Sequence, residues 1–297
     1  MPDPFPVAII GLDTSHAVEY PRRMQAPDCP AESRVPGLRA VSCLRFPSAF
    51  QAESGQDSRQ AQLEAWGIRV AADVADAVRD AKGILLEIND PALHVSWFEQ
   101  VAQLGLPVFI DKPLADTVQA GAGMVRLARK HGARVSSSSP LRCDAALQRA
   151  CSQMPRPEQT WVYGPLGQAP TGSSIVWYGV HAVEMLQRAM GVGAVAVSAR
   201  RDASGVVVVV DYGDRRRGVA ELTTGAWIYG GALRNGTSAV SFAVDSAAIY
   251  TAQLHEVERF LRGGEPAATL DDALEVLAML DAAERSARSG HSEPVYR

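Results

Sequence analysis

The residues with the clearest chemical potential are Asp111-Lys112-Pro113, which follow the apolar run Leu106–Ile110. If that run is a strand, the carboxylate and the ammonium lie at the edge of a sheet. The chain contains only three lysines among its 29 basic residues. A lysine in a chain that otherwise uses arginine favours a site that needs a compact ammonium or a group able to change its protonation.

A second candidate is the segment Gly11-Leu12-Asp13-Thr14-Ser15-His16. It stands where dinucleotide-binding folds carry G-x-G-x-x-G, but only Gly11 matches. Asp13 at the second glycine adds bulk and negative charge, which counts against ordinary dinucleotide binding. Thr14 and Ser15 either donate hydrogen bonds to a phosphate or cap the following helix, and the sequence supports both interpretations equally. His16 would soften the repulsion by pairing with Asp13.

Two more charged residues accompany predicted strands. Arg45 follows the second strand, where NAD-selective folds usually have an acid. It suits the 2′-phosphate of NADP, which slightly favours NADP over NAD, or it is a surface arginine. Glu87, in the apolar run Gly83–Ile88, is either a buried acid of raised pKa at the substrate site or a carboxylate bonded to backbone.

The elements that must position these residues alternate in type over residues 1–139. A continuous apolar run that stops at Gly11 is typical of a central parallel strand. Further strands are predicted at Leu38–Leu44, Gly83–Ile88, Leu106–Ile110 and Val135, with helices between them. This α/β pattern predicts a Rossmann-like, doubly wound parallel sheet with its ligand site at the carboxyl ends of the strands.

Residues 140–297 have a different order of predicted strands and helices, which predicts an α+β domain for substrate binding and oligomerisation. Prolines between 155 and 170 indicate irregular chain, and a helix follows over Tyr178–Met190. Glycine-bearing turns separate strands of a mostly antiparallel sheet. The predicted strands are Val195–Arg200, Val206–Tyr212, Arg217–Thr223 and Ala239–Val244, and the closing helices are Ala247–Leu261 and Leu270–Ser289.

In combination, these motifs resemble the glucose–fructose oxidoreductase, inositol dehydrogenase and rhizopine-catabolism family, Gfo/Idh/MocA. The shared marks are Gly11, the segment Asn89–His94, Gly105–Pro113, Gly179-Val180-His181 and Gly263-Gly264-Glu265-Pro266. The resemblance implies hydride transfer at a sugar or cyclitol carbon. It also implies Lys112 near the nicotinamide, His181 as the acid–base group, and Asn89 and Asp90 beside the cofactor.

The departures from the family bear on the substrate. Trp177 stands where relatives often carry an aspartate, and a tryptophan favours a flatter, less polar ligand than a plain hexose. Helical spacing puts Tyr178, His181 and Glu184 on one face, where Glu184 would orient the imidazole. The segment Ser136–Ser139 precedes Arg142, a candidate carboxylate or phosphate ligand. Tyr229 is a weaker substrate candidate.

Composition excludes several classes of protein. Net charge is −4 without a basic run, so no nucleic-acid partner is expected. No apolar stretch is long enough to cross a membrane, and the N-terminal residues lack a secretory pattern, which predicts a cytoplasmic protein. The four cysteines and six histidines show no metal-ligand spacing, so we expect buried free thiols and no metal.

The leading hypothesis is an NAD(P)-dependent oxidoreductase acting on a small sugar, cyclitol or secondary metabolite, as a homodimer or homotetramer. Two alternatives stay open. One is a lyase, isomerase or cyclase that has lost the redox cofactor and uses Lys112 and His181 for proton transfer. The other is a non-catalytic ligand-binding protein.

Overall fold

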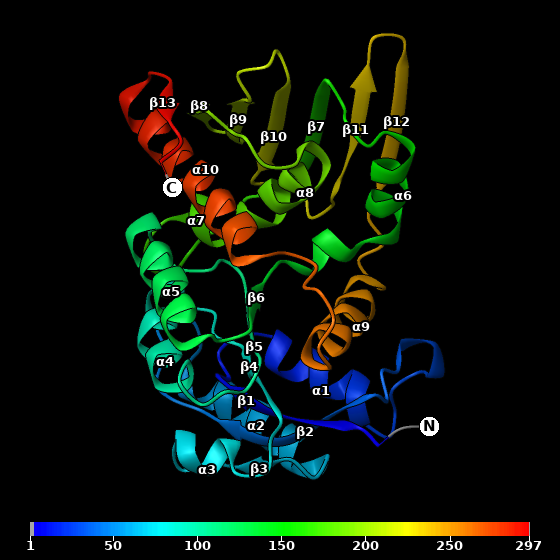
Figure 1. Ribbon diagram of the computed structural model, residues 1–297, viewed down its shortest axis with the longest axis vertical. Coiled ribbons are helices and arrows are strands. Elements are labelled where there is room, and N and C mark those ends of the chain that lie inside the picture. Colours follow the sequence, from blue (N-terminus) through cyan, green and yellow to red (C-terminus); the bar gives the residue numbers. More distant parts are fainter. Residues whose placement is uncertain (1–2, 297) are drawn as a thin grey trace. The chain divides into compact units, whose positions relative to one another are not determined.

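The computed structural model describes residues 3–296, which form two compact units that interleave in the sequence (Figure 1). Met1 and Pro2, the start of the segment used to predict a cytoplasmic protein, lie outside the described residues. The first unit runs to Ala115 and adds Gly123–Ser137 and Tyr250–Leu270. The second unit consists of Asp116–Ala122, Ser138–Ile249 and the residues from Asp271 on.

The first unit is the predicted doubly wound domain, which confirms this part of the fold class. Its six parallel strands lie in the order β3-β2-β1-β4-β5-β6. The strands are β1 Phe5–Ile10, β2 Leu38–Leu44, β3 Arg69–Val70, β4 Gly83–Leu86, β5 Val108–Ile110 and β6 Val135–Ser137. Chain order reverses between β1 and β4, and such a switch point is where ligands bind in open α/β sheets.

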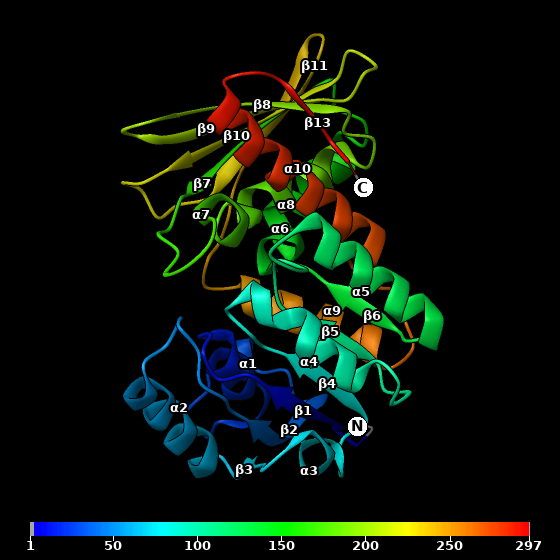
Figure 2. The same cartoon turned by 90° about the vertical axis from the view of Figure 1, so that its left-hand side faces the viewer.

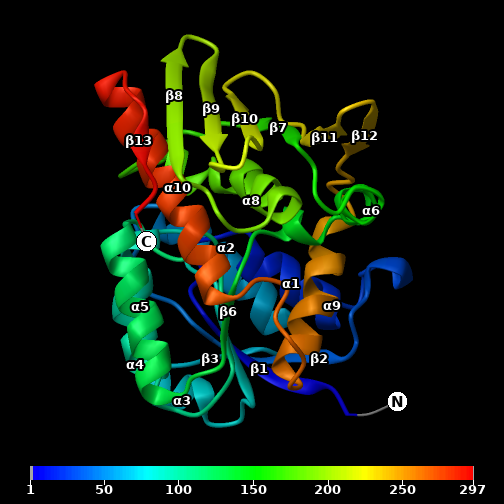
Figure 3. The ribbon, with the colours of Figure 1, turned by 45° about the horizontal axis from the view of Figure 1, so that its top comes forward.

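Helices cover both faces of this sheet. They are α1 His16–Gln25, α2 Glu53–Ala65, α3 Val74–Val78, α4 His94–Val101, α5 Val118–His131 and α9 Ile249–Leu261, with short 3-10 turns η1 Ala31–Ser33 and η2 Pro91–Leu93. Figures 1 and 3 show α4 and α5 on one side and α1 and α9 on the other. Helix α9 was predicted in the second domain, yet Leu254, Val257 and Phe260 complete the core formed by β1, β2 and α1.

The second unit contains a seven-stranded sheet in the order β12-β11-β7-β10-β9-β8-β13. Strands β7 and β10 pair in parallel, and the other neighbours are antiparallel. Figure 2 shows this sheet from the side. The strands are β7 Gln159–Pro165, β8 Ala196–Asp202, β9 Gly205–Asp211, β10 Arg217–Thr223, β11 Gly230–Asn235, β12 Ser238–Ala243 and β13 Glu293–Pro294.

Helix α8 packs on β7 and β10, next to α6 and the 3-10 turn η3. The helices are η3 Pro140–Cys143, α6 Ala145–Gln153, α7 Ser174–Trp177, α8 Val180–Met190 and α10 Leu270–Ser289. Irregular chain was predicted for residues 155–170, and this prediction was wrong over β7. That strand lies in the middle of the sheet, and its pairing with β10 and β11 outweighs the weak local pattern.

All four cysteines are buried and free, as predicted. Burial raises the pKa of the Cys43 thiol to about 12, against the opposing effect of Arg45. Because the thiolate is the nucleophile, we expect Cys43 to stay unlabelled by Ellman's reagent at pH 8 in the native protein. In guanidinium all four cysteines should react. Peptide mapping distinguishes them, and stoichiometric native labelling at Cys43 would contradict the buried assignment.

Candidate active site

The turn between β1 and α1 requires glycine at its first position. Gly11 has φ +110°, and a Cβ there would lie 2.1 Å from the carbonyl oxygen of Glu87. The end of β1 therefore approaches the end of β4 more closely than any side chain allows. Helix α1 begins at His16, so the turn leads into a helix N-terminus, where unpaired N–H groups favour an anion.

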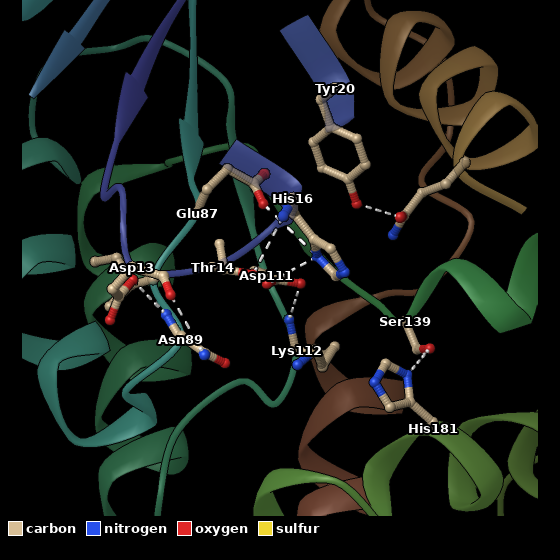
Figure 4. A network of polar contacts seen from close by, with 12 residues as sticks. Asp13, Thr14, His16, Tyr20, Glu87, Asn89, Asp111, Lys112, Ser139 and His181 are labelled. Carbon is tan, nitrogen blue, oxygen red and sulfur yellow. Dashed lines mark hydrogen bonds and ion pairs between the residues drawn. The ribbon is translucent and has the colours of Figure 1, made fainter. Parts of the chain in front are cut away.

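Asp13 is engaged within the protein rather than paired with His16. It is 1% exposed. Oδ1 accepts a hydrogen bond from the Asn89 N–H (2.8 Å) and Oδ2 accepts one from the Ser48 hydroxyl (2.6 Å). Asp13 thus joins the segments that follow β1, β2 and β4, and Figure 4 shows its contact with Asn89. Hydrogen bonds to both carboxylate oxygens spread the negative charge that the sequence placed in the path of a phosphate.

Thr14 and Ser15 differ in their environments. The Thr14 hydroxyl accepts a hydrogen bond from the His16 N–H (3.3 Å), so it serves the start of α1. Ser15 occupies the N-cap position but makes no side-chain capping bond, and it is exposed. Helix capping therefore accounts for the hydroxyl of Thr14, but it does not account for the hydroxyl of Ser15. A phosphate contact by either hydroxyl stays a prediction.

His16 instead joins Glu87 and Asp111 in a buried cluster at the edge of the sheet (Figure 4). His16 Nδ1 lies 3.0 Å from Asp111 Oδ2 and 4.0 Å from Glu87 Oε2. Burial together with Asp111 raises the pKa of Glu87, and Lys112 opposes this shift. For Asp111 burial also acts to raise the pKa, but His16 and Lys112 outweigh it and hold the pKa low.

Lys112 follows Asp111 at the end of β5, and its own N–H donates to Asp111 Oδ1 (2.8 Å). Its side chain is nearly buried. Asn89 binds Asp13 through its N–H, and Asp90 caps η2 by accepting from the Ala92 N–H (3.1 Å). These contacts explain the local geometry of all three residues, and their predicted contacts with a cofactor stay predictions.

His94 is a positioning residue that the sequence analysis did not single out. Its two ring nitrogens lie 3.2 Å from the Leu114 carbonyl and 2.8 Å from the Ile88 carbonyl. It therefore joins the chain after β5 to the chain after β4. Only its place at the end of the Asn89–His94 segment could have indicated such a role.

Arg45 follows β2 and lines a pocket of about 300 Å³ together with Phe46, Ser48 and Glu53. Its guanidinium donates to Asp57 Oδ1 (2.6 Å) and to Gln60 Oε1 (2.9 Å). Arg45 is thus oriented by α2. Phe46 stacks on Trp97 with ring centroids 4.3 Å apart. The pocket lies where a doubly wound fold holds the adenosine half of its nucleotide.

In the second unit, His181 lies at the start of α8 and is 7% exposed. Its Nδ1 is 2.7 Å from the Ser139 hydroxyl (Figure 4). The same hydroxyl accepts from the Leu141 N–H (3.2 Å). The Ser139 hydroxyl is thus a partner of the imidazole, and the predicted orientation of the ring by Glu184 stays a prediction. The ring also makes edge contacts with Tyr178 and Tyr229, at centroid distances of 5.0 and 6.0 Å.

The aromatic residues around His181 form a connected group. Tyr178 contacts Trp177 at 5.1 Å and Trp227 at 5.4 Å between centroids. Burial raises the pKa of Tyr178, opposed by its side-chain hydrogen bond with Tyr229. Tyr229 packs directly on Gly164, where a Cβ would meet its ring at 2.7 Å. The predicted substrate residues Trp177, Tyr178 and Tyr229 therefore do lie together around His181.

Arg142 and Glu184 form a buried pair one helical turn beyond His181. The Arg142 guanidinium donates to Glu184 Oε2 (3.2 Å) and to Gln187 Oε1 (2.6 Å). Glu184 Oε1 also accepts from the Ser139 N–H (3.3 Å). Burial raises the pKa of Glu184, and Arg142 opposes this shift. The pair explains both side chains structurally, so their predicted substrate contacts stay predictions.

A family model described as "Oxidoreductase family, NAD-binding Rossmann fold", GFO_IDH_MocA, matches residues 38–139. This segment is similar to the Gfo/Idh/MocA family. The match confirms the resemblance seen in the motifs and supports an oxidoreductase with a nicotinamide dinucleotide as its cofactor. No curated protein matches the sequence significantly.

Solved structures of dehydrogenases and other oxidoreductases share the fold over nearly the whole chain. A probable dehydrogenase from Thermotoga maritima has 14% identity and a TM-score of 0.81, covering 98% of this chain and 99% of that chain. GenD2 from gentamicin A biosynthesis, in complex with NAD, has 18% identity and a TM-score of 0.79, covering 100% and 98%. A myo-inositol dehydrogenase from Corynebacterium glutamicum has 14% identity and a TM-score of 0.79, covering 99% of each chain.

The described residues fit the family's dinucleotide at three points. A helix N-terminus follows Gly11 and favours a pyrophosphate. The carboxylate of Asp13 already accepts two hydrogen bonds from the protein. The pocket beside Arg45 offers space after β2. Over the described part of the chain, no helix has the length and apolar character needed to cross a membrane.

Proposed function

We propose that this protein is an NAD(P)-dependent dehydrogenase of a small sugar, cyclitol or secondary-metabolite substrate, acting at a carbinol or carbonyl carbon. The observation that carries the proposal is His181, whose Nδ1 is held by the Ser139 hydroxyl within an aromatic surround. An oriented imidazole, which titrates near neutral pH, suits the proton transfer that accompanies hydride transfer.

The residues divide the chemistry between them. A bound nicotinamide supplies or accepts the hydride. His181 takes the hydroxyl proton as the carbinol is oxidised, and Ser139 keeps the ring oriented because its hydroxyl can serve Nδ1 in either tautomer. Lys112 stabilises the developing alkoxide with its ammonium. This role for Lys112 and His181 rests on the family resemblance and on the chemistry of the two groups.

The aromatic group of Trp177, Tyr178 and Tyr229 supports a substrate with one apolar or flat face. Aromatic walls contribute apolar contact area, and the two tyrosines add hydroxyls that can hydrogen-bond a polyol. GenD2 is an enzyme from gentamicin A biosynthesis, and the Corynebacterium glutamicum protein is a myo-inositol dehydrogenase, which supports this substrate class.

Calorimetric titration with NADH and with NADPH tests the proposal, after absorbance and mass spectrometry have shown that no nucleotide co-purifies. We expect micromolar binding. Activity is then measured with both oxidised cofactors against a panel of cyclitols, aminosugars and aryl-substituted polyols. No binding of either cofactor to folded protein at millimolar concentration would overturn the dehydrogenase assignment.

Arg45 is expected to carry the preference for NADP. Replacing Arg45 with alanine should weaken NADPH binding about tenfold and leave NADH binding nearly unchanged, because only the 2′-phosphate pairs with the guanidinium. Calorimetry of both cofactors with both proteins measures the difference.

The matched variant is Asp57→Asn, which removes the charge that now competes for Arg45. It should strengthen NADPH binding and leave NADH binding unchanged. If each variant changes the affinities for NADPH and NADH equally, Arg45 does not select the cofactor. It is then a surface residue that only bonds to α2.

One observation favours a second candidate function, proton-transfer catalysis without a redox cofactor. Asp13 and His16 replace the second and third glycines of the dinucleotide loop, and both are buried. Such an enzyme would show no nicotinamide binding in the titration above, yet would lose activity on replacement of His181. The expected homodimer or homotetramer also stays a prediction, and Trp227, Ile228 and Val207 are exposed.

A further inference from the structure

The cluster of His16, Glu87 and Asp111, here named the triad, draws its members from three neighbouring strands. His16 follows the turn after β1, Glu87 directly follows β4, and Asp111 directly follows β5. Strands β1, β4 and β5 are consecutive in the parallel sheet. Their carboxyl ends therefore lie at one edge and bring an imidazole and two carboxylates to a single place.

Both carboxylate oxygens of Glu87 are buried and have no hydrogen-bond partner among the described residues. His16 Nδ1 and Asp111 Oδ2 face each other at 3.0 Å as an ion pair. The three residues are 5%, 0% and 0% exposed. Buried polar atoms are normally bonded, as in His94, whose two ring nitrogens both face carbonyl oxygens. Glu87 points toward His16 in Figure 4, so its unbonded oxygens face the other two members.

The separations suit ligands that share one metal ion. One ligand atom from each residue can be chosen so that all three lie within 4.8 Å of one another. Two ligands bound at about 2.1 Å lie about 3.0 Å apart at right angles and about 3.4 Å apart in a tetrahedron. The 3.0 Å between His16 Nδ1 and Asp111 Oδ2 matches the separation of two ligands at right angles. Glu87 Oε2 lies 4.0 Å from His16 Nδ1, so the Glu87 side chain must rotate to share the ion.

The donor set narrows the choice of ion. Calcium and magnesium prefer sites made of oxygen, whereas imidazole suits zinc, iron and other first-row ions. Two carboxylates supply two negative charges, and Lys112 is the neighbouring cation whose charge acts on both of them. We propose that His16, Glu87 and Asp111 bind one first-row divalent cation, with zinc, iron(II) or manganese(II) as the fitting ions.

Such an ion would replace the missing second and third glycines as the device that holds α1 against the sheet. In the dinucleotide loop the third glycine allows close helix–strand packing. His16 stands at that position, and a shared ion would join the start of α1 to the ends of β4 and β5. The inference does not depend on the proposed dehydrogenase activity, because it concerns the triad and not the substrate.

The experiment uses untagged full-length protein, stripped with a chelator and then titrated separately with Zn²⁺ and Mn²⁺ by calorimetry. Elemental analysis after desalting counts the bound metal, and the visible spectrum of a Co²⁺-substituted sample reports the ligand geometry. We expect about one ion per chain. The variants Glu87→Gln and His16→Gln should each weaken binding at least about tenfold. Bound metal should also raise the Tm of the wild type and not that of the variants.

The matched control is Glu275→Gln, a buried carboxylate in the second unit that accepts hydrogen bonds from the Gly193 and Ala194 N–H groups. It should keep wild-type metal affinity. Circular dichroism verifies the fold of each variant, and the Co²⁺ spectrum of the wild type tests the donor set if a variant fails to fold. The proposal is overturned if folded wild type binds no metal at millimolar concentration. It is equally overturned if both triad variants bind as tightly as the control.

Discussion

Replacing His181 with asparagine is expected to lower kcat by about 10²–10⁴-fold while NAD(P)H affinity stays within about twofold of the wild type. The amide keeps a similar size and hydrogen-bonding capacity at the start of α8, but it cannot accept and release a proton near neutral pH. Steady-state kinetics with the best substrate of the panel and calorimetry with the cofactor measure the two quantities.

Ser139→Ala provides the graded comparison. It removes the hydroxyl 2.7 Å from His181 Nδ1 and leaves the imidazole in place, so a loss of about tenfold in kcat with a shifted pH profile is expected. The pH dependence of kcat is the deciding measurement, because a purely structural role of Ser139 would leave it unchanged. Unchanged turnover in His181→Asn would remove His181 from the mechanism and favour a purely structural histidine.

Replacing Glu184 with alanine is expected to lower the free energy of unfolding by about 3–5 kcal/mol. The change takes away the carboxylate that faces a buried guanidinium, so Arg142 keeps its charge in the interior without Glu184, while its hydrogen bond to Gln187 Oε1 (2.6 Å) is retained. The Ser139 N–H also loses its acceptor. Urea denaturation, with the m-value compared between proteins, measures the loss.

The double variant Arg142→Leu, Glu184→Leu separates a charge effect from a packing effect. Removing both charges should restore most of the lost stability, because an apolar pair of similar volume often substitutes for a buried ion pair. If Arg142→Leu alone leaves stability unchanged and raises KM strongly, the guanidinium serves the substrate, as the sequence suggested. If Arg142→Leu instead lowers stability and changes KM little, the pair of Arg142 and Glu184 has a structural role and holds η3 against α8.

The fold was predictable because its signals are local. The run Val7–Ile10 is apolar on both faces and ends at a glycine with φ +110°, which is how a central parallel strand meets a tight turn. Helix α10 was predicted with the bounds Leu270–Ser289 that the structure has, because its helical periodicity is long and uninterrupted. Strand β7 was not predicted, because it is stabilised by pairing with β10 and β11 in the sheet rather than by a local pattern of its own residues.

The candidate site was predictable only in part. The sequence named Lys112 and His181 as chemical groups, and it named Trp177, Tyr178 and Tyr229, which the structure gathers around His181. It did not show that the Ser139 hydroxyl contacts His181, because a serine among four has no distinguishing pattern. Side-chain partners across a fold depend on where backbone segments meet, which spacing along one segment does not encode.

By itself, the sequence determined the class of fold, the family resemblance and the types of group available for chemistry, because apolar periodicity, glycine positions and short motifs act within a few residues. Only the tertiary structure decided the pairings. It directed Asp13 to Ser48 and Asn89, His16 to Glu87 and Asp111, and Arg142 to Glu184. The physical reason is that burial forces each charged or polar group to find a partner nearby in space, and parallel strands bring together segments that lie far apart in the chain.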